Sequence, residues 1–379
     1  MPAADSLSSR HGASSETVPG PLERQRALVR PRRSVMALEH LTAALAIIYV
    51  GLGGLLYHRL GNPSYLAHLL EPHLWNSLVY LAPSGAAALL VYHRLAARAP
   101  DGTRVRGISA GWRAAWHDAR KGAFSSGRLA FALVTILSAP LFFNAFAAWK
   151  SLIPAVHPFS MDPLLAHLDA MLHGGAPDRL LERLPLIPLD RIYFFAWGEL
   201  LVLALVVLAW RAETRVLLAF LLTWILLGTV VAMAVPSAGP PYFLALTGRN
   251  DYSGLFTRLE HANGVPLIAL QIQRNLWRVY QTGSVAAASG ISAFPSMHVA
   301  VPALLAFAAW GRSRLLSLLL GVFAMIILLS SVALGWHYAV DGYASVLGAG
   351  AIWVLVSRLP MRSVFGDRPS LVSGAGRAE

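Results

Sequence analysis

Long apolar stretches separated by short polar segments dominate the chain. A membrane-spanning helix needs about 20 consecutive apolar residues, and Pro140 interrupts the third stretch of this kind while the sixth is short. The pattern predicts an all-α integral membrane protein with about eight transmembrane helices. The predicted spans are residues 36–58, 74–93, 129–149, 191–210, 215–235, 294–310, 315–335 and 337–357.

Composition agrees with this pattern. Of the 379 residues, 56% are hydrophobic and 13% are charged, whereas soluble domains carry about 25% charged residues. The chain has no cysteine, which excludes disulfides and thiolate chemistry. The net charge of +12 comes almost entirely from arginine, because Lys121 and Lys150 are the only lysines. In a membrane protein the positive-inside bias explains such charge better than nucleic-acid binding, so we expect no nucleic-acid partner.

The basic residues also predict the topology. With the N-terminus inside, the inner segments hold 22 of the 31 Lys and Arg residues. An even number of spans brings both basic tails to the same face. We therefore expect cytoplasmic termini in a bacterial inner membrane. The inner count is six in 1–35, eight in 94–128, two each in 211–215 and 312–314, and four from Arg358 onward.

The domain organisation follows from these spans. Residues 1–35 are polar and basic and predict a disordered cytoplasmic tail. The first apolar stretch lies too far into the chain, and is too long, for a cleaved signal peptide. Residues 36–128 then supply two helices and a basic inner loop, residues 129–358 form a six-helix catalytic membrane domain, and 359–379 form a second cytoplasmic tail.

Two outer connections, at about 150–190 and 236–293, are longer than the inner turns. The second opens with PSAGPPYF. In the first, apolar residues recur at helical spacing, which predicts an amphipathic helix at the membrane interface over 161–173. Its apolar positions are Met161, Leu164, Leu165, Leu168 and Leu172.

The predicted topology brings several polar residues to one outer face. His298 falls at the outer end of the sixth span, and His337 falls where the eighth span begins. Asp341 follows His337 by four residues, so the two share a helix face. PSAGPPYF lies on the same side of the membrane. Segments about 100 residues apart thus meet at one depth and define a candidate site on the outer, periplasmic face.

Each histidine also has an ordinary interpretation. His298 could be an interfacial residue, and His337, beside Trp336 and Tyr338, could belong to an aromatic belt. Asp341 is harder to explain in this way, because a carboxylate in an apolar span is costly and usually faces a cavity and a partner. A histidine oriented by a carboxylate is a stronger nucleophile, and a second histidine can then act as acid and base.

The sequence FPSMH predicts a phosphate site at the start of the sixth span. Pro295 suits the first turn of a helix. Unpaired amides at a helix N-terminus, together with the Ser296 hydroxyl, favour a bound phosphate. Two histidines, a carboxylate and this helix start indicate phosphoryl transfer through a phosphohistidine, which requires no metal and no cofactor.

These residues carry a family resemblance. SAFPSMH and SSVALGWHYAVD resemble the second and third signature motifs of the type 2 phosphatidic acid phosphatase superfamily. PSAGPPYF is similar to the Pro-Pro form of the first motif in the inositol phosphorylceramide synthase-like branch, where Pro240, Pro241 and Tyr242 would contact substrate. The resemblance covers about residues 140–357. It implies that His337 is the nucleophile, that Asp341 orients it, and that His298 protonates the leaving group.

The sequence departs from the phosphatase branch at its charged positions. Ser331 stands where that branch usually has an arginine, and the usual lysine and arginine are missing around PSAGPPYF. A phosphomonoester carries about two charges near neutral pH and would require such groups, so these losses favour a phosphodiester. The alternative is that arginines of the second outer connection fold over the phosphate, namely Arg249, Arg258, Arg274 or Arg278.

The sequence therefore favours a phosphotransferase that moves a head group such as inositol phosphate from a phospholipid to a lipid hydroxyl such as that of ceramide. A lipid phosphate or polyprenyl-phosphate phosphatase is the alternative. A haem carrier would not need Asp341, and a transporter would place its polar residues at the midplane. Two local patterns are rejected: GISAG around Ser109, which lacks a preceding strand, and a metal site at His157, His167 and His173.

Overall fold

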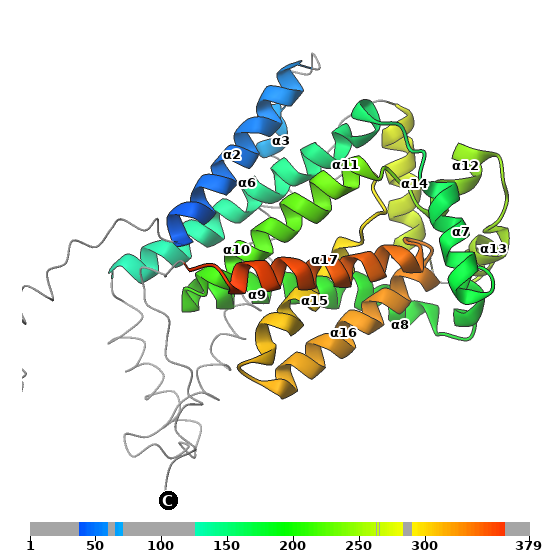
Figure 1. Cartoon of the computed structure of the whole chain (residues 1–379). Helices are drawn as coiled ribbons and strands as arrows, with labels where there is room; N and C mark the ends of the chain where they lie inside the picture. The colour runs from blue at the N-terminus through cyan, green and yellow to red at the C-terminus, as the bar shows by residue number, and fades with distance from the viewer. Residues whose placement is uncertain are drawn as a thin grey trace, which may run out of the picture. The chain divides into compact units, whose positions relative to one another are not determined.

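The computed structural model describes residues 38–59, 65–70, 126–262, 264, 266–282 and 290–360, and these form helices and loops without a strand (Figure 1). Within these described residues, six helical segments are long and apolar enough to span a membrane. Two of them are composite, since α8, η3 and α9 run continuously, as do α10, η4 and α11. The six are α2 (Leu38–Arg59), α6 (Ser126–Val156), Leu186–Arg211, Thr214–Ala234, α16 (Arg314–Ala333) and α17 (Ala339–Ser357).

Comparison with the eight predicted spans gives three outcomes. Six correspond to these long helices, and α6 continues through Pro140 instead of breaking there. The predicted span 294–310 is the helix α15 (Met297–Trp310), which has only 14 residues. The predicted span 74–93 lies outside the described residues, as do Ser109 and most of both predicted tails.

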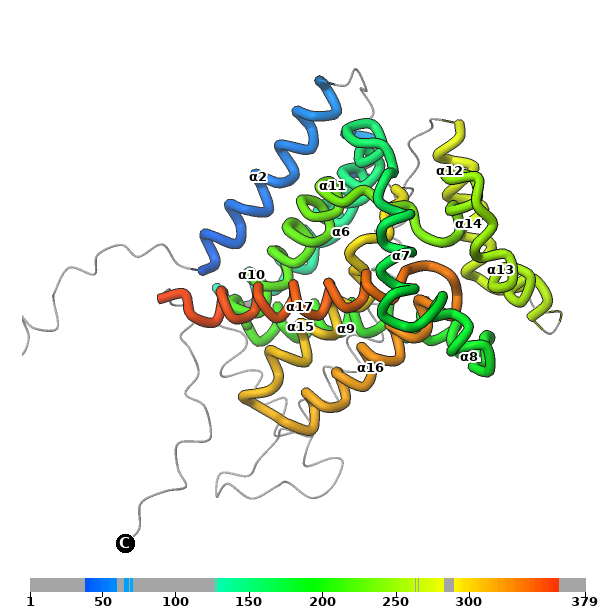
Figure 2. Tube along the Cα trace, turned by 45° about the vertical axis from the view of Figure 1, so that its right-hand side comes forward, coloured from blue at the N-terminus to red at the C-terminus, as the bar shows by residue number. Residues whose placement is uncertain are grey.

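Helix α15 is the central element of the described membrane domain. It packs against α16 and α17, and in Figure 2 it lies between α16 and the α10 region. Val299, Ala300 and Leu304 are fully buried, and the apolar residues of α15 therefore face other helices. By contrast, α2, α16 and α17 expose Ile47, Leu318 and Leu347, as expected for surfaces that contact lipid.

Two segments of the composite helices are π-helical. They are η3 (Ile192–Ala196), between α8 (Leu186–Arg191) and α9 (Trp197–Arg211), and η4 (Thr223–Val231), between α10 (Thr214–Leu222) and α11 (Ala232–Ala234). Such wide turns are rare and frequently occur at functional sites. Hydrophobic periodicity did not predict them.

Polar contacts at one end of the helices join the short turns predicted to lie inside. The Glu213 carboxylate accepts from Arg312 at 2.6 Å, and Arg215 donates to the last carbonyls of α17. Thr214 donates to Glu39 on α2 at 2.8 Å. We call this the charged end. The turns 211–215 and 312–314 and the end of α17 thus share one end of the molecule, as the charge pattern predicted.

Short helices lie towards the opposite end, which we call the site end. The predicted amphipathic helix is α7 (Asp162–His173), but its buried face carries Asp162, Leu165 and Asp169. Leu164, Leu168 and Leu172 of the predicted apolar face are exposed, so they remain free to contact the membrane interface as predicted, while a second face with two carboxylates packs against the protein. The other short elements are α3 (Tyr65–Leu69), η2 (Pro177–Leu181), η5 (Pro240–Tyr242), α12 (Phe243–Thr247), α13 (Ser253–Glu260) and α14 (Ile268–Gln281).

Candidate active site

His337 and Asp341 are in contact at the site end. His337 lies in the loop after α16, two residues before α17 begins, and not on the first helical turn as its spacing predicted. Its Nδ1 lies 3.3 Å from Asp341 Oδ2. The same carboxylate oxygen accepts the backbone N–H of Tyr338 at 3.0 Å. Asp341 is fully buried, so the cap at the start of α17 holds the carboxylate against the imidazole.

His298 faces His337 from the start of α15. The centroids of the two rings are 6.4 Å apart, a separation that a single phosphoryl group can bridge. Trp197 Nε1 donates to the backbone oxygen of His298 at 2.9 Å. The Tyr193 ring stacks on the imidazole with centroids 4.4 Å apart and an interplanar angle of 18°. These contacts fix His298 opposite His337.

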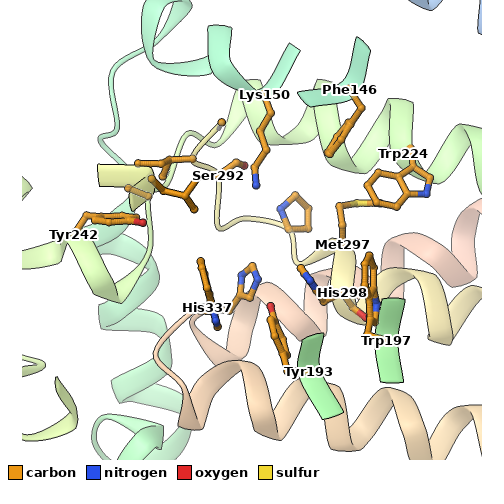
Figure 3. Close-up of a pocket in the computed structure, with 16 residues that line it drawn as sticks. Phe146, Lys150, Tyr193, Trp197, Trp224, Tyr242, Ser292, Met297, His298 and His337 are labelled. Atoms are coloured by element: carbon orange, nitrogen blue, oxygen red, sulfur yellow. The ribbon is translucent and has the colours of Figure 1, made fainter. Parts of the chain in front are cut away.

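The space between the histidines opens into a pocket of about 200 Å³ (Figure 3). Its polar part is formed by Lys150, Ser292 and the two histidines, while Trp224 belongs to an aromatic part. Both π-helical segments contribute to its wall. The lining residues are Phe146, Lys150, Tyr193, Trp197, Trp224, Ala238, Tyr242, Leu276, Gly290, Ile291, Ser292, Pro295, Met297, His298, Trp336 and His337.

Lys150 is a site residue that the sequence analysis missed. It extends from α6 towards the pocket (Figure 3) and is the only Lys or Arg that lines it among the described residues. A Cβ added at Gly290 would lie 2.6 Å from the Lys150 carbonyl carbon and Cβ, so the absence of a side chain at Gly290 permits this position. The available signal was a lysine inside an apolar stretch, which is a functional candidate by default.

The surroundings of His337 favour its neutral form. Burial, together with the charge of Lys150, lowers the pKa of His337 from its usual range to about 3. At neutral pH the imidazole is therefore unprotonated. In the tautomer in which Nδ1–H donates to Asp341, the lone pair lies on Nε2 and can attack an electrophile.

Asp162 of α7 anchors the PSAGPPYF segment next to the His337 loop. Its carboxylate accepts from Ser237 Oγ at 2.9 Å and from the N–H groups of Ala238 and Gly239 at 3.0 and 2.7 Å. It also accepts from the Tyr338 hydroxyl at 3.0 Å. Gly239 has φ +93°, and a Cβ there would lie 2.8 Å from the Trp336 carbonyl oxygen. The conformation and the close approach both require glycine.

Asp169 performs a similar task two turns further along α7. It accepts from the N–H groups of Ala339 and Val340 at 2.7 and 2.9 Å, the first amides of α17. Neither Asp162 nor Asp169 was among the predicted site residues. Both are buried, and together they hold the segments on either side of the pocket.

The predicted substrate-binding residues divide into two groups. Pro295 and Tyr242 line the pocket together with the two histidines, whereas Ser296, Pro240 and Pro241 do not. Ser296 is the N-cap of α15, with φ −74° and ψ 107°, so Pro295 precedes the helix and is not in its first turn as predicted. The Ser296 hydroxyl is fully buried and has no hydrogen-bond partner among the described residues.

None of the four arginines considered as phosphate ligands lines the pocket. Arg249 pairs with Asp251, Arg274 pairs with Glu260, and Arg258 donates to the Leu181 carbonyl oxygen at 3.2 Å. The Ser331 hydroxyl is buried and donates to the Leu328 carbonyl oxygen of its own helix. Lys150 is therefore the candidate cation of the site.

Residues 187–355 match the family described as the PAP2 superfamily, the phosphatidic acid phosphatase type 2 group. The match suggests a membrane enzyme with phosphatase or phosphotransferase activity on lipid phosphates. It runs from α8 to α17 and includes His298, His337 and Asp341, whereas Lys150 and α7 lie outside it. No curated protein and no solved structure matches the chain.

Proposed function

We propose that the protein is an integral-membrane phosphotransferase that moves a phosphoryl head group from a phospholipid to a lipid hydroxyl. The donor head group is inositol phosphate and the acceptor is a lipid such as ceramide. The observation that carries this proposal is the pair of histidines facing each other across a pocket with one lining cation.

The residues divide the chemistry between them. Nε2 of His337 attacks the phosphorus while Nδ1–H donates to Asp341. The bond from phosphorus to the leaving oxygen breaks, and His298 passes a proton to that oxygen. His298 then removes the proton of the acceptor hydroxyl, whose oxygen attacks the phosphohistidine and releases His337. Phosphorus keeps its head group throughout, so the acceptor gains the whole phosphoryl unit.

The charge of the pocket supports a phosphodiester donor. A phosphodiester carries one negative charge, whereas a phosphomonoester carries about two near neutral pH. Lys150 alone offsets one charge, and the lining includes no other Lys or Arg among the described residues. The phosphatase alternative uses the same histidines with water as acceptor, and it is favoured only if a second cation reaches the phosphate.

Labelled phosphatidylinositol, incubated with the purified protein with and without ceramide, separates the two activities. We expect a new labelled lipid only when ceramide is present, and none with the matched variant His337→Ala. Release of free inositol phosphate or free phosphate in both tubes, without a new lipid, would exclude the transferase and favour the phosphatase.

We also propose that the site end faces outward and the charged end faces the cytoplasm. The supporting observation is that the arginine-rich turns gather at the charged end, away from the histidines. The cysteine-free chain permits a direct test. In intact cells an impermeant maleimide should label the exposed position of Ser253→Cys but not that of Ser357→Cys, and the reverse pattern would overturn this orientation.

A further inference from the structure

Tyr193 occupies an unusual position in the wall of the pocket. It lies on the π-helical segment η3, its side chain is 1% exposed, and its ring stacks with those of both His298 and Trp336. Its hydroxyl has no hydrogen-bond partner among the described residues. A buried hydroxyl without a partner costs free energy, so the fold gains nothing from this group that phenylalanine would not supply.

The geometry limits what the hydroxyl can reach. A phenol hydroxyl lies in the plane of its ring, and His298 lies over the face of that ring at an angle of 18°. The hydroxyl therefore does not point at the ring nitrogens of His298. In Figure 3 it is directed towards the space between His298 and His337. That is where the transferred phosphoryl group is placed by the proposed function.

We infer that Tyr193 is a further catalytic residue, whose hydroxyl donates a hydrogen bond to a non-bridging oxygen of the phosphoryl group. The inference rests on the proposed function. A neutral donor stabilises the charge that develops on these oxygens without adding a second cation to the pocket. With Lys150 it supplies two contacts to the phosphoryl group, in a site whose lining includes no arginine among the described residues.

The test compares Tyr193→Phe with Tyr49→Phe in the full-length protein. Tyr49 is a suitable control because it is also a buried tyrosine of the membrane domain, and its hydroxyl bonds to Thr229 at 2.7 Å, outside the pocket lining. The measurements are kcat and KM for the transferase reaction, inhibition by orthovanadate as a phosphate analogue, and thermal stability. For Tyr193→Phe we expect kcat/KM to fall about 10- to 100-fold and vanadate inhibition to weaken similarly, with stability unchanged. Tyr49→Phe should lose stability but keep its vanadate inhibition.

The other outcomes are also decisive. Activity and vanadate inhibition within twofold of wild type would overturn the inference. Loss of turnover with unchanged vanadate inhibition would also overturn it, and would make Tyr193 a positioning residue for Asp341, whose Oδ1 also lacks a partner among the described residues. Failure of Tyr193→Phe to fold would also overturn the inference, because it would show that the hydroxyl makes a hydrogen bond needed for the fold. A wild-type protein with no phosphotransferase activity would refute the proposed function instead.

Discussion

The charged end and the pocket at the site end treat their polar groups in opposite ways. At the charged end Glu213 lies within ion-pair distance of both Arg211 and Arg312, and Arg215 donates to carbonyl oxygens of the α17 C-terminus. At the site end, Tyr193, Trp224 and Trp336 line the pocket with donors that lack partners among the described residues. Buried polar groups with hydrogen-bond partners hold neighbouring helices together. Buried donors without partners do not stabilise the fold, but they can bind a ligand.

This difference separates residues needed for stability from residues needed for chemistry. Substitutions at the charged end should reduce stability and leave the reaction intact. Substitutions among the groups facing the pocket should do the reverse. The variants below test that separation, from the largest expected effect to the smallest.

Loss of either histidine or of the orienting carboxylate should have the largest effect. His337→Ala, His298→Ala and Asp341→Asn should each lower kcat by roughly 10³-fold or more, because each removes one role in the same step. Membrane insertion should be unaffected, as followed by the yield of folded protein in membranes. Near-normal turnover of Asp341→Asn would show that the orienting role is wrong.

Lys150→Met should lower kcat/KM by about 10- to 100-fold, because it removes the only cation that lines the pocket in the described part of the chain. It should also change the pH profile. The charge of Lys150 helps to hold the pKa of His337 at about 3, so its removal raises that pKa, and the acid limb of kcat/KM moves to higher pH. Arg274→Met removes an exposed, paired cation instead and should change neither quantity.

Gly290→Ala tests the position of Lys150 without altering its charge. The added methyl group would lie 2.6 Å from the carbonyl carbon and Cβ of Lys150, so the lysine must shift. We expect a fall in kcat/KM of about tenfold, mainly through KM, because the phosphate contact weakens uniformly. Gly311→Ala is the matched control, since nothing lies within 4 Å of a Cβ there. Equal activity of the two variants would argue against a fixed Lys150.

Glu213→Gln should have the smallest effect, and on stability alone. It weakens pairs with Arg211 and Arg312 that are partly open to solvent, and such pairs contribute about 1 kcal/mol or less. The apparent Tm should fall slightly, while kcat/KM stays within twofold of wild type. A large loss of activity would remove the distinction between the two ends.

Hydrophobic length and charge bias predicted most of the described helices and the shared end of the short turns. They also indicated that His298, His337 and PSAGPPYF would meet. The order of spans determines at which end of the helices a residue lies, although it does not determine which side chains touch. The helical spacing of His337 and Asp341 predicted a contact that forms in a different way, from a loop through the cap of α17.

The remaining features depend on tertiary structure. The apolar stripe of α7 predicted a face at the membrane interface, but it did not show that the opposite face, with Asp162 and Asp169, is buried because the amides at Ala238, Gly239, Ala339 and Val340 require acceptors. The π-helical turns that carry Tyr193 and Trp224 cannot be recognised from the hydrophobic pattern, which is read with the α-helical period of 3.6 residues. Lys150 is 187 residues from His337 in sequence, so its role required the packing of α6.

The short length of α15 sets the depth at which the reaction occurs. Its 14 residues extend about 21 Å at 1.5 Å per residue, against a hydrocarbon thickness of about 30 Å. His298 is 12 residues from Trp310 along the helix, or about 18 Å, so a bilayer with one boundary at Trp310 would have its other boundary about 12 Å beyond the imidazole. The phosphate of a substrate lipid must therefore move deeper than the phosphates of the surrounding lipids, or the bilayer must thin around the protein, before the imidazole can reach it. Membrane thickness thus becomes a variable of catalysis, and turnover should be faster in bilayers of short-chain lipids.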